Sequence, residues 1–123
     1  MPAYQVPDTT IYQQAPEGLV VVELDGGAVY HFNHAAQAVL DHFREPDDVD
    51  GLIRALGVDG VEAQHLRQLC EMLVERRILR PHAAPVARAP RARSGPYARP
   101  VLLRQERKVA DDLRALGSPY GPN

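Results

Sequence analysis

The residues with the most chemical potential in the first 80 positions are four histidines and a single cysteine. A metal site needs three or four converging ligands. His31 and His34 are three residues apart, but the first ends an expected strand and the second opens an expected helix. His42 and His65 fall within expected helices, so the spacing gives no common centre. We therefore predict solvated or hydrogen-bonded histidines and no metal site.

Cys70 follows Leu69 in an apolar helical pattern, which predicts a buried thiol rather than a nucleophile. A nucleophilic thiol needs a base and a means of lowering its pKa, and no nearby residue clearly supplies either. The acidic clusters fall at expected helix starts or on helix faces, where capping and solvation explain them. They are Asp47, Asp48, Asp50, Asp111 and Asp112. The sequence predicts no phosphate loop, no cofactor and no enzymatic activity.

The net charge of −2 over 123 residues conceals an asymmetry. Residues 1–80 contain 13 acidic and 6 basic side chains, whereas residues 81–123 contain 8 basic and 3 acidic ones. An acidic domain is a poor binder of nucleic acid backbones and attracts basic segments. No apolar run approaches the roughly 20 residues of a membrane helix, and the first residues do not resemble a secretory signal. We expect a cytoplasmic protein with no membrane partner.

The segment VVVELDGGAVYHF, residues 20–32, predicts two strands joined by a tight turn. A three-residue loop at 25–27 would place a glycine in the left-handed conformation. In that register one face of the hairpin carries Val20, Val22, Leu24, Ala28, Tyr30 and Phe32. The other face carries Val21, Glu23, Val29 and His31. A first strand at Ile11–Gln14 would protect the middle strand and leave the outer edge of 28–32 open.

Three helices follow in the pattern of apolar residues. The first is predicted to begin at an Asn33 N-cap, the second at Asp47 or Asp48, and the third at Asp59, which forms a capping box with Glu62. Their inward residues are predicted to be Ala36, Val39, Leu40, Phe43, Val49, Leu52, Ile53, Leu56, Leu66, Leu69 and Leu73. The third helix should end near Arg77, and Ile78-Leu79 should return to the core. The fold class is α+β: a small winged-helix-like domain with a two- to three-stranded antiparallel sheet followed by three helices.

The composition changes after residue 81. Residues 82–100 predict a disordered basic linker rich in Pro, Ala and Arg. Residues 101–117 regain helical spacing through Leu102, Val109, Leu113 and Leu116. Such a helix is marginal in isolation and should order only on contact. Residues 118–123 predict a flexible end.

Two stretches, EGLVVVELDGGAVYHFNHAAQAVL and VDGLIRALGVDGVEAQHLRQLCEMLVERRILRP, resemble the PqqD-like proteins. The matching features are Phe32-Asn33 after a strand, the small residues Ala35-Ala36, the sequence Asp50-Gly51-Leu52, and the run from Leu73 to Leu79. The resemblance covers about residues 11–81. Arg76-Arg77 stand where a glycine is common in that family, and the basic tail lies outside the family pattern.

The resemblance implies a peptide-binding domain at residues 1–81, a RiPP recognition element or peptide chaperone. Such domains bind the leader of a ribosomal precursor peptide and present it to a modifying enzyme, often a radical SAM enzyme, in natural product or PQQ biosynthesis. The leader adds as a strand beside the third strand, against the third helix. The site implied here has three parts. The edge strand is Ala28, Val29, Tyr30, His31 and Phe32; the wall is Leu66, Leu69, Cys70 and Leu73; the rim is Arg67, Val74 and Arg77.

Two other functions stay open from the sequence. A winged-helix DNA-binding regulator would read DNA with the third helix, but the outward residues of that helix are mixed to acidic, whereas DNA-bound helices are normally basic. A structural module could instead dimerise through the edge strand. The tail helix could dock on the acidic domain, bind a partner enzyme, or cover the peptide site until a leader displaces it.

Overall fold

The protein is an α+β structure with two antiparallel sheets and three helices. The computed structural model describes residues 3–83 and 96–106. One sheet has the strand order β2-β3-β4-β7, and these strands are Thr10–Ala15, Gly18–Glu23, Ala28–Phe32 and Leu102–Glu106. The other has the order β5-β1-β6, and these strands are Asp47–Asp48, Ala3–Gln5 and Arg80–His82. The helices are α1 (Ala36–His42), α2 (Val49–Leu56) and α3 (Gly60–Glu75).

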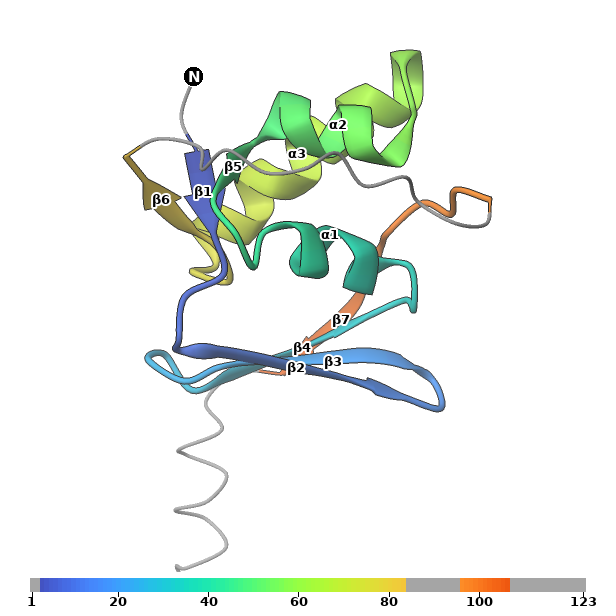
Figure 1. Cartoon of the computed structure of the whole chain (residues 1–123). Helices are drawn as coiled ribbons and strands as arrows, with labels where there is room; N and C mark the ends of the chain where they lie inside the picture. Colours follow the sequence, from blue (N-terminus) through green and yellow to red (C-terminus); the bar gives the residue numbers. More distant parts are fainter. Residues whose placement is uncertain (1–2, 84–95, 107–123) are drawn as a thin grey trace, which may run out of the picture.

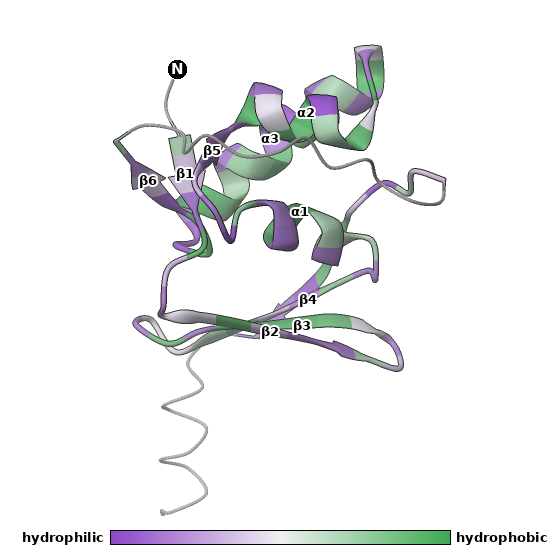
Figure 2. Cartoon of the chain, viewed as in Figure 1, coloured by the Kyte–Doolittle hydropathy of each residue, from purple (hydrophilic) through white to green (hydrophobic). Residues whose placement is uncertain are grey.

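All three helices lie on one side of the four-stranded sheet (Figure 1). Helix α1 is next to the sheet, and α2 and α3 lie beyond it, with the three-stranded sheet beside them. Hydrophobic residues dominate the middle of β3 (Figure 2). One core cluster joins β3, β4 and the helices, and it includes Phe32, Phe43 and Leu52, all at most 1% exposed. The helices therefore cover one face of the sheet.

The predicted hairpin register is wrong by one residue on β3. In the structure Glu23 pairs with Ala28 and Val21 pairs with Tyr30. The inward residues of β4 are the expected ones, but Val21 is buried and Val20 lies on the opposite face. The predicted register assumed a three-residue loop at 25–27 and therefore placed Glu23 on the outer face, whereas the observed pairing leaves residues 24–27 between the two strands. The turn instead accommodates Glu23 inside, where its Oε1 accepts a hydrogen bond of 2.8 Å from the Gly26 amide.

The ends of the helices follow the predicted caps only in part. Asp48 caps α2 by accepting a hydrogen bond of 2.7 Å from Gly51. The N-cap of α1 is Ala35, so the prediction of Asn33 as its cap is wrong. Asp59 is at the N-cap position of α3 but makes no capping hydrogen bond, so the capping box with Glu62 is also wrong. The side chains of Asn33 and Glu62 bind another part of the chain, described below.

The C-terminal end of α3 turns sharply back onto the core. Helix α3 ends at Glu75, and Arg77 adopts a left-handed conformation with φ 63°. This conformation favours glycine and is uncommon for other residues. Ile78 and Leu79 are then at most 1% exposed, which confirms their predicted return to the core. The chain continues into β6, which pairs with β1.

The predicted helix at 101–117 is wrong where the structure describes it, because residues 102–106 form β7. Intrinsic helix propensity is a weak preference, and an open strand edge offers backbone hydrogen bonds that a marginal helix cannot match. Residues 107–117 and the predicted flexible end at 118–123 lie outside the described residues. Of the predicted linker, residues 84–95 also lie outside them, and Pro100 is fully buried.

Candidate functional site

The outer edge of β4 is paired with a strand from the C-terminal part of the same chain (Figure 1). Strand β7 is antiparallel to β4, with Tyr30 opposite Gln105 and Phe32 opposite Leu102. The register shifts between His31 and Phe32, as at a β-bulge. We call residues 96–106 the tail segment. The edge that the sequence predicts to be open is therefore covered by the tail segment.

Asn33 holds the backbone of the tail segment immediately after β4. Its amide donates a hydrogen bond of 2.9 Å to the carbonyl of Val101. Its side-chain Oδ1 accepts one of 2.9 Å from the Val101 amide, and its Nδ2 donates one of 2.6 Å to the carbonyl of Arg99. All three bonds go to backbone atoms, so Asn33 recognises an extended chain whatever its side chains are.

Helix α3 contacts the tail segment from the other side through its N-terminal half. His65 Nε2 lies 2.8 Å from the carbonyl oxygen of Pro100. Since a carbonyl oxygen only accepts, His65 carries a proton on Nε2. Glu62 receives two hydrogen bonds from Arg99, of 3.1 and 2.6 Å. The Arg99 guanidinium holds the pKa of Glu62 below its usual range, so the pair is charged at neutral pH.

The C-terminal end of the tail segment contacts the C-terminal end of α3. Arg76, the C-cap residue of α3, donates a hydrogen bond of 3.3 Å from Nε to Gln105. Because Glu62 lies in the first turn of α3, the tail segment runs alongside nearly the whole helix. The tail segment is thus held between the β4 edge and α3.

Apolar contacts complete the binding of the tail segment. Pro100 is fully buried, and Leu102 packs against the core cluster. Leu103, at the register shift, is 56% exposed. On the outer face of the sheet, His31 Nε2 lies 2.8 Å from Glu106 Oε1, in a pair that remains partly exposed. The apolar part of the recognition therefore rests on Pro100 and Leu102.

Only some of the residues that the resemblance implies as a peptide site lie on a common binding surface. The side chains of Ala28, Tyr30 and Phe32 point into the core, so only their backbone faces the tail segment. Val29 and His31 lie on the outer face and are half-buried. The expected edge strand is therefore correctly placed, with its backbone as the contact.

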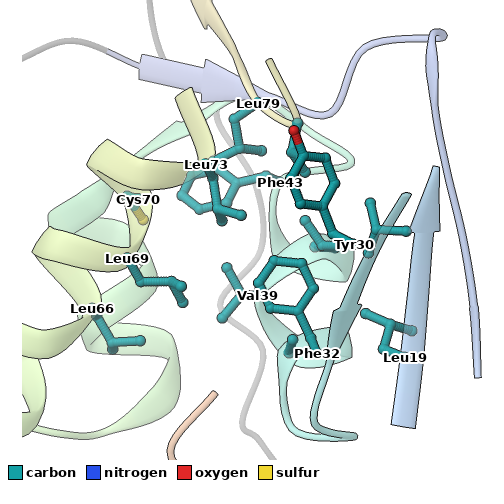
Figure 3. Packing of buried hydrophobic residues seen from close by; sticks show 14 of the residues in the cluster. Leu19, Tyr30, Phe32, Val39, Phe43, Leu66, Leu69, Cys70, Leu73 and Leu79 are labelled. Atoms are coloured by element: carbon teal, nitrogen blue, oxygen red, sulfur yellow. The ribbon is translucent and has the colours of Figure 1, made fainter. Parts of the chain in front are cut away.

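The expected helix wall lies in the core rather than on a free surface. Figure 3 shows Leu66, Leu69 and Leu73 of α3 pointing toward the β4 side chains, and Cys70 lies on the same helix. All four are at most 6% exposed. The expected rim is dispersed. Val74 is half-buried, Arg67 is exposed and its Nη2 lies 2.7 Å from Asp50, and Arg77 is exposed beside a pocket next to β4.

The sequence interpretation missed the polar residues that contact the tail segment: Asn33, Glu62, His65 and Arg76. It assigned Asn33 and Glu62 to helix capping. It predicted that His65 is solvated or hydrogen-bonded but did not identify a partner. It also missed Pro100 and Leu102 as apolar contacts. The one feature of the sequence that indicated contact between domain and tail was their opposite net charge. The ion pair between Glu62 of the domain and Arg99 of the tail segment is an example of this attraction.

The remaining chemically reactive side chains of the described residues are the Cys70 thiol and the histidines. Burial raises the pKa of the Cys70 thiol to about 12, since the desolvation effect exceeds the opposing charge of Arg67. Within residues 3–83 and 96–106, no group of three or more His, Cys, Asp or Glu side chains is arranged to hold a metal ion. Four of the histidines among them lie within hydrogen-bonding distance of a partner, namely His31, His34, His42 and His65. No helix in this part of the chain is long and apolar enough to cross a membrane.

Comparison with known proteins adds no relative to this description. No protein-family model matches the sequence, and neither the curated proteins nor the solved structures contain a match. The functional argument therefore rests on the β4 edge and the tail segment.

Proposed function

We propose that the protein is a non-catalytic, PqqD-like peptide-binding domain that captures a precursor leader peptide as an added strand on β4. The single observation that supports this most is the pairing of β7 with β4. It establishes that the β4 edge accepts an antiparallel strand from a segment some 70 residues away, between the sheet and α3. Strand addition of this kind takes its affinity from backbone hydrogen bonds and its specificity from alternate side chains.

The contacts at this edge suit a ligand from another chain as well as the tail segment. Asn33 binds three backbone atoms, two of Val101 and one of Arg99, and His65 binds a backbone carbonyl. These bonds require an extended chain but not this particular chain. A leader peptide on β4 would use the same bonds and would have to replace the tail segment.

The proposed role is presentation of the peptide to a modifying enzyme, of which a radical SAM enzyme is the candidate type. Two features support a carrier rather than a catalyst. The thiol at Cys70 is buried with a raised pKa, and the bonds that Asn33 and His65 make to the tail segment all go to its backbone. The proposal places the protein in the biosynthesis of a peptide-derived natural product or cofactor.

The test is a backbone NMR titration of the full, isotope-labelled chain with an unlabelled candidate leader. We expect shift changes at 28–33 and along α3, together with loss of the signals of a docked β7. A matched titration with a proline placed at the centre of the same peptide should produce no such changes, because proline removes a strand hydrogen bond. Shift changes confined to the outer face of β2, or none at saturating peptide, would refute strand capture at β4.

A further inference from the structure

A pocket at the N-terminal end of β4 contains a buried carboxylate, that of Glu23. Glu23 is 3% exposed, and its Oε1 accepts the hydrogen bond from the Gly26 amide. Among the described residues, its Oε2 is buried and has no hydrogen-bond partner. Buried polar groups are nearly always hydrogen-bonded, and a buried charge is costly without a counter-charge. An unpartnered carboxylate oxygen therefore points to a missing donor.

The pocket lies where a strand bound to β4 leaves the sheet. It has a volume of about 330 Å³, and its lining includes Glu23, Ala28, Tyr30 and Gln105. Gln105 is the residue of β7 opposite Tyr30. The pocket is thus continuous with the site that holds the tail segment.

The strand register identifies which residue of a bound peptide would reach this carboxylate. Val29 pairs with Glu106, so in a peptide bound in the same register and continuing by one residue, that residue would lie opposite Ala28. Ala28 is paired on its other side with Glu23. Since alternate residues share a face, that residue would lie on the same side of the sheet as Gln105, which is exposed and lines the pocket. We call it the exit position.

The other charged residues of the pocket do not neutralise Glu23. Arg76 donates to Gln105, and its Nη1 lies 3.7 Å from Glu75. Arg77 is exposed, and no ion pair joins it to Glu23 in the described part of the chain. Two arginines and two glutamates line the pocket, but only Glu23 is buried. We therefore expect Glu23 to determine which charge the pocket prefers, because charge interactions are strongest away from water.

We propose that Glu23 binds a guanidinium or ammonium group at the exit position of the strand held on β4. The inference rests on the proposed function and names one side chain of the peptide: a basic residue directly after the segment that pairs with Val29 and Tyr30. The protein's own sequence has Arg107 after Glu106, although that residue lies outside the described part of the chain. Glu23 is then a specificity residue, which reads one position of the peptide.

The test compares synthetic peptides that carry the sequence of residues 96–106 followed by one variable residue, either arginine or its neutral isostere citrulline. Binding to the full chain is measured by NMR titration or calorimetry. We expect the arginine peptide to bind roughly tenfold tighter, the size expected of a hydrogen bond to a charged group. The difference should disappear in the Glu23→Gln variant and persist in Glu75→Gln, which changes an exposed carboxylate of the same pocket.

Each outcome has a distinct meaning. Equal binding of the two peptides, with shifts at β4, would overturn the role of Glu23 and leave the proposed function intact. A third peptide, with glutamate at the variable position, is titrated alongside them; if it bound tightest, the role of Glu23 would also be overturned, because Arg76 or Arg77 would then dominate the pocket. No binding of any peptide, with no shifts at β4 even at peptide concentrations well above the roughly millimolar effective concentration of the tethered tail segment, would count against the proposed function itself. The folding of Glu23→Gln is checked by its NMR spectrum before titration.

Discussion

At the scale of residues, recognition of the tail segment depends on a few polar groups that bind backbone. Asn33 supplies two side-chain bonds, and His65 supplies one. Each such bond adds only about 1 kcal/mol net, but an unpaired buried partner costs more than the bond contributes. Ion pairs at the surface, such as Glu62 with Arg99, contribute little. These side-chain contacts therefore fix where the strand lies, while the backbone pairing with β4 and the apolar contacts of Pro100 and Leu102 add to the affinity.

The first prediction concerns Asn33. We expect Asn33→Ala to weaken the docking of the tail segment by about 1–2 kcal/mol, because two side-chain hydrogen bonds are lost. Hydrogen exchange of the backbone amides of 29–31 and 102–106 should accelerate accordingly. His34→Ala is the matched control, since His34 contacts Gln14 and Pro16 instead of the tail segment. Unchanged exchange in Asn33→Ala would show that the side-chain hydrogen bonds of Asn33 do not hold β7 against β4.

The second prediction concerns the buried thiol of Cys70 at alkaline pH. The thiol ionises near its usual pKa of 9.0 in the unfolded chain and at about 12 in the folded one. Between these values the unfolded chain binds fewer protons, so stability must fall as pH rises. The thiol contributes a slope of at most about 1.4 kcal/mol per pH unit. Burial also raises the pKa of Tyr12, which adds to the decline above pH 10.

Urea denaturation measured from pH 8 to 10 tests this sign. Cys70→Ala should be less stable than the natural chain at pH 8, because it leaves a small cavity. Its stability should nevertheless decline less between pH 9 and 10. Parallel declines in the two proteins would mean that the thiol is accessible to water. Reaction of the native thiol with a disulfide reagent at pH 8 should likewise be slow and limited by unfolding.

At the scale of elements, the sequence predicts what periodicity controls and misses what distant contacts control. The apolar spacing that includes Leu66 and Leu73 predicts the inward face of α3 correctly, because burial and helical period agree. The register of β3 is missed because the turn buries Glu23, against the usual preference of charge for water. Strand β7 is missed because its conformation comes from the β4 edge rather than from its own sequence. The contact of Asn33 with the tail segment is missed because asparagine is also a common N-cap residue, and the sequence alone does not separate the two roles.

The third prediction separates the two leucines of β7. Leu102 packs against the core, whereas Leu103 is 56% exposed. We expect Leu102→Ala to destabilise the docked strand by about 1–2 kcal/mol, less than the ~2–5 kcal/mol of a fully buried leucine. Leu103→Ala should stay within about 0.5 kcal/mol, as surface changes usually do.

Hydrogen exchange of the β4 amides, measured in both variants, gives the comparison. The substitutions are chemically identical and lie at adjacent positions, so helix or strand propensity cannot account for a difference. Equal effects would contradict the register that places Leu102 opposite Phe32. They would also weaken the inference about the exit position, which depends on that register.

At the scale of the whole molecule, an acidic domain and its basic tail are parts of one chain, and the tail segment is a tethered occupant of the β4 edge. A tethered ligand acts at an effective concentration that is of order millimolar for a short flexible connection. A free peptide must compete with that concentration. The full chain should therefore bind external peptides far more weakly than the same domain without its tail segment.

The fourth prediction quantifies this competition. Deleting residues 84–123 removes β7 and should raise the affinity for a free peptide with the sequence of residues 96–106. If that peptide binds the shortened chain with a Kd of about 10 μM, a tether of roughly 1 mM predicts about a 100-fold weaker apparent affinity for the full chain. Deleting only residues 110–123 keeps β7 and should change the affinity little. If only the longer deletion raises the apparent affinity, the tail segment competes with the peptide for the β4 edge. At saturating peptide the full and shortened chains should then be equally occupied. Equal affinities in all three chains would mean that the peptide binds elsewhere, because the β4 edge holds only one added strand.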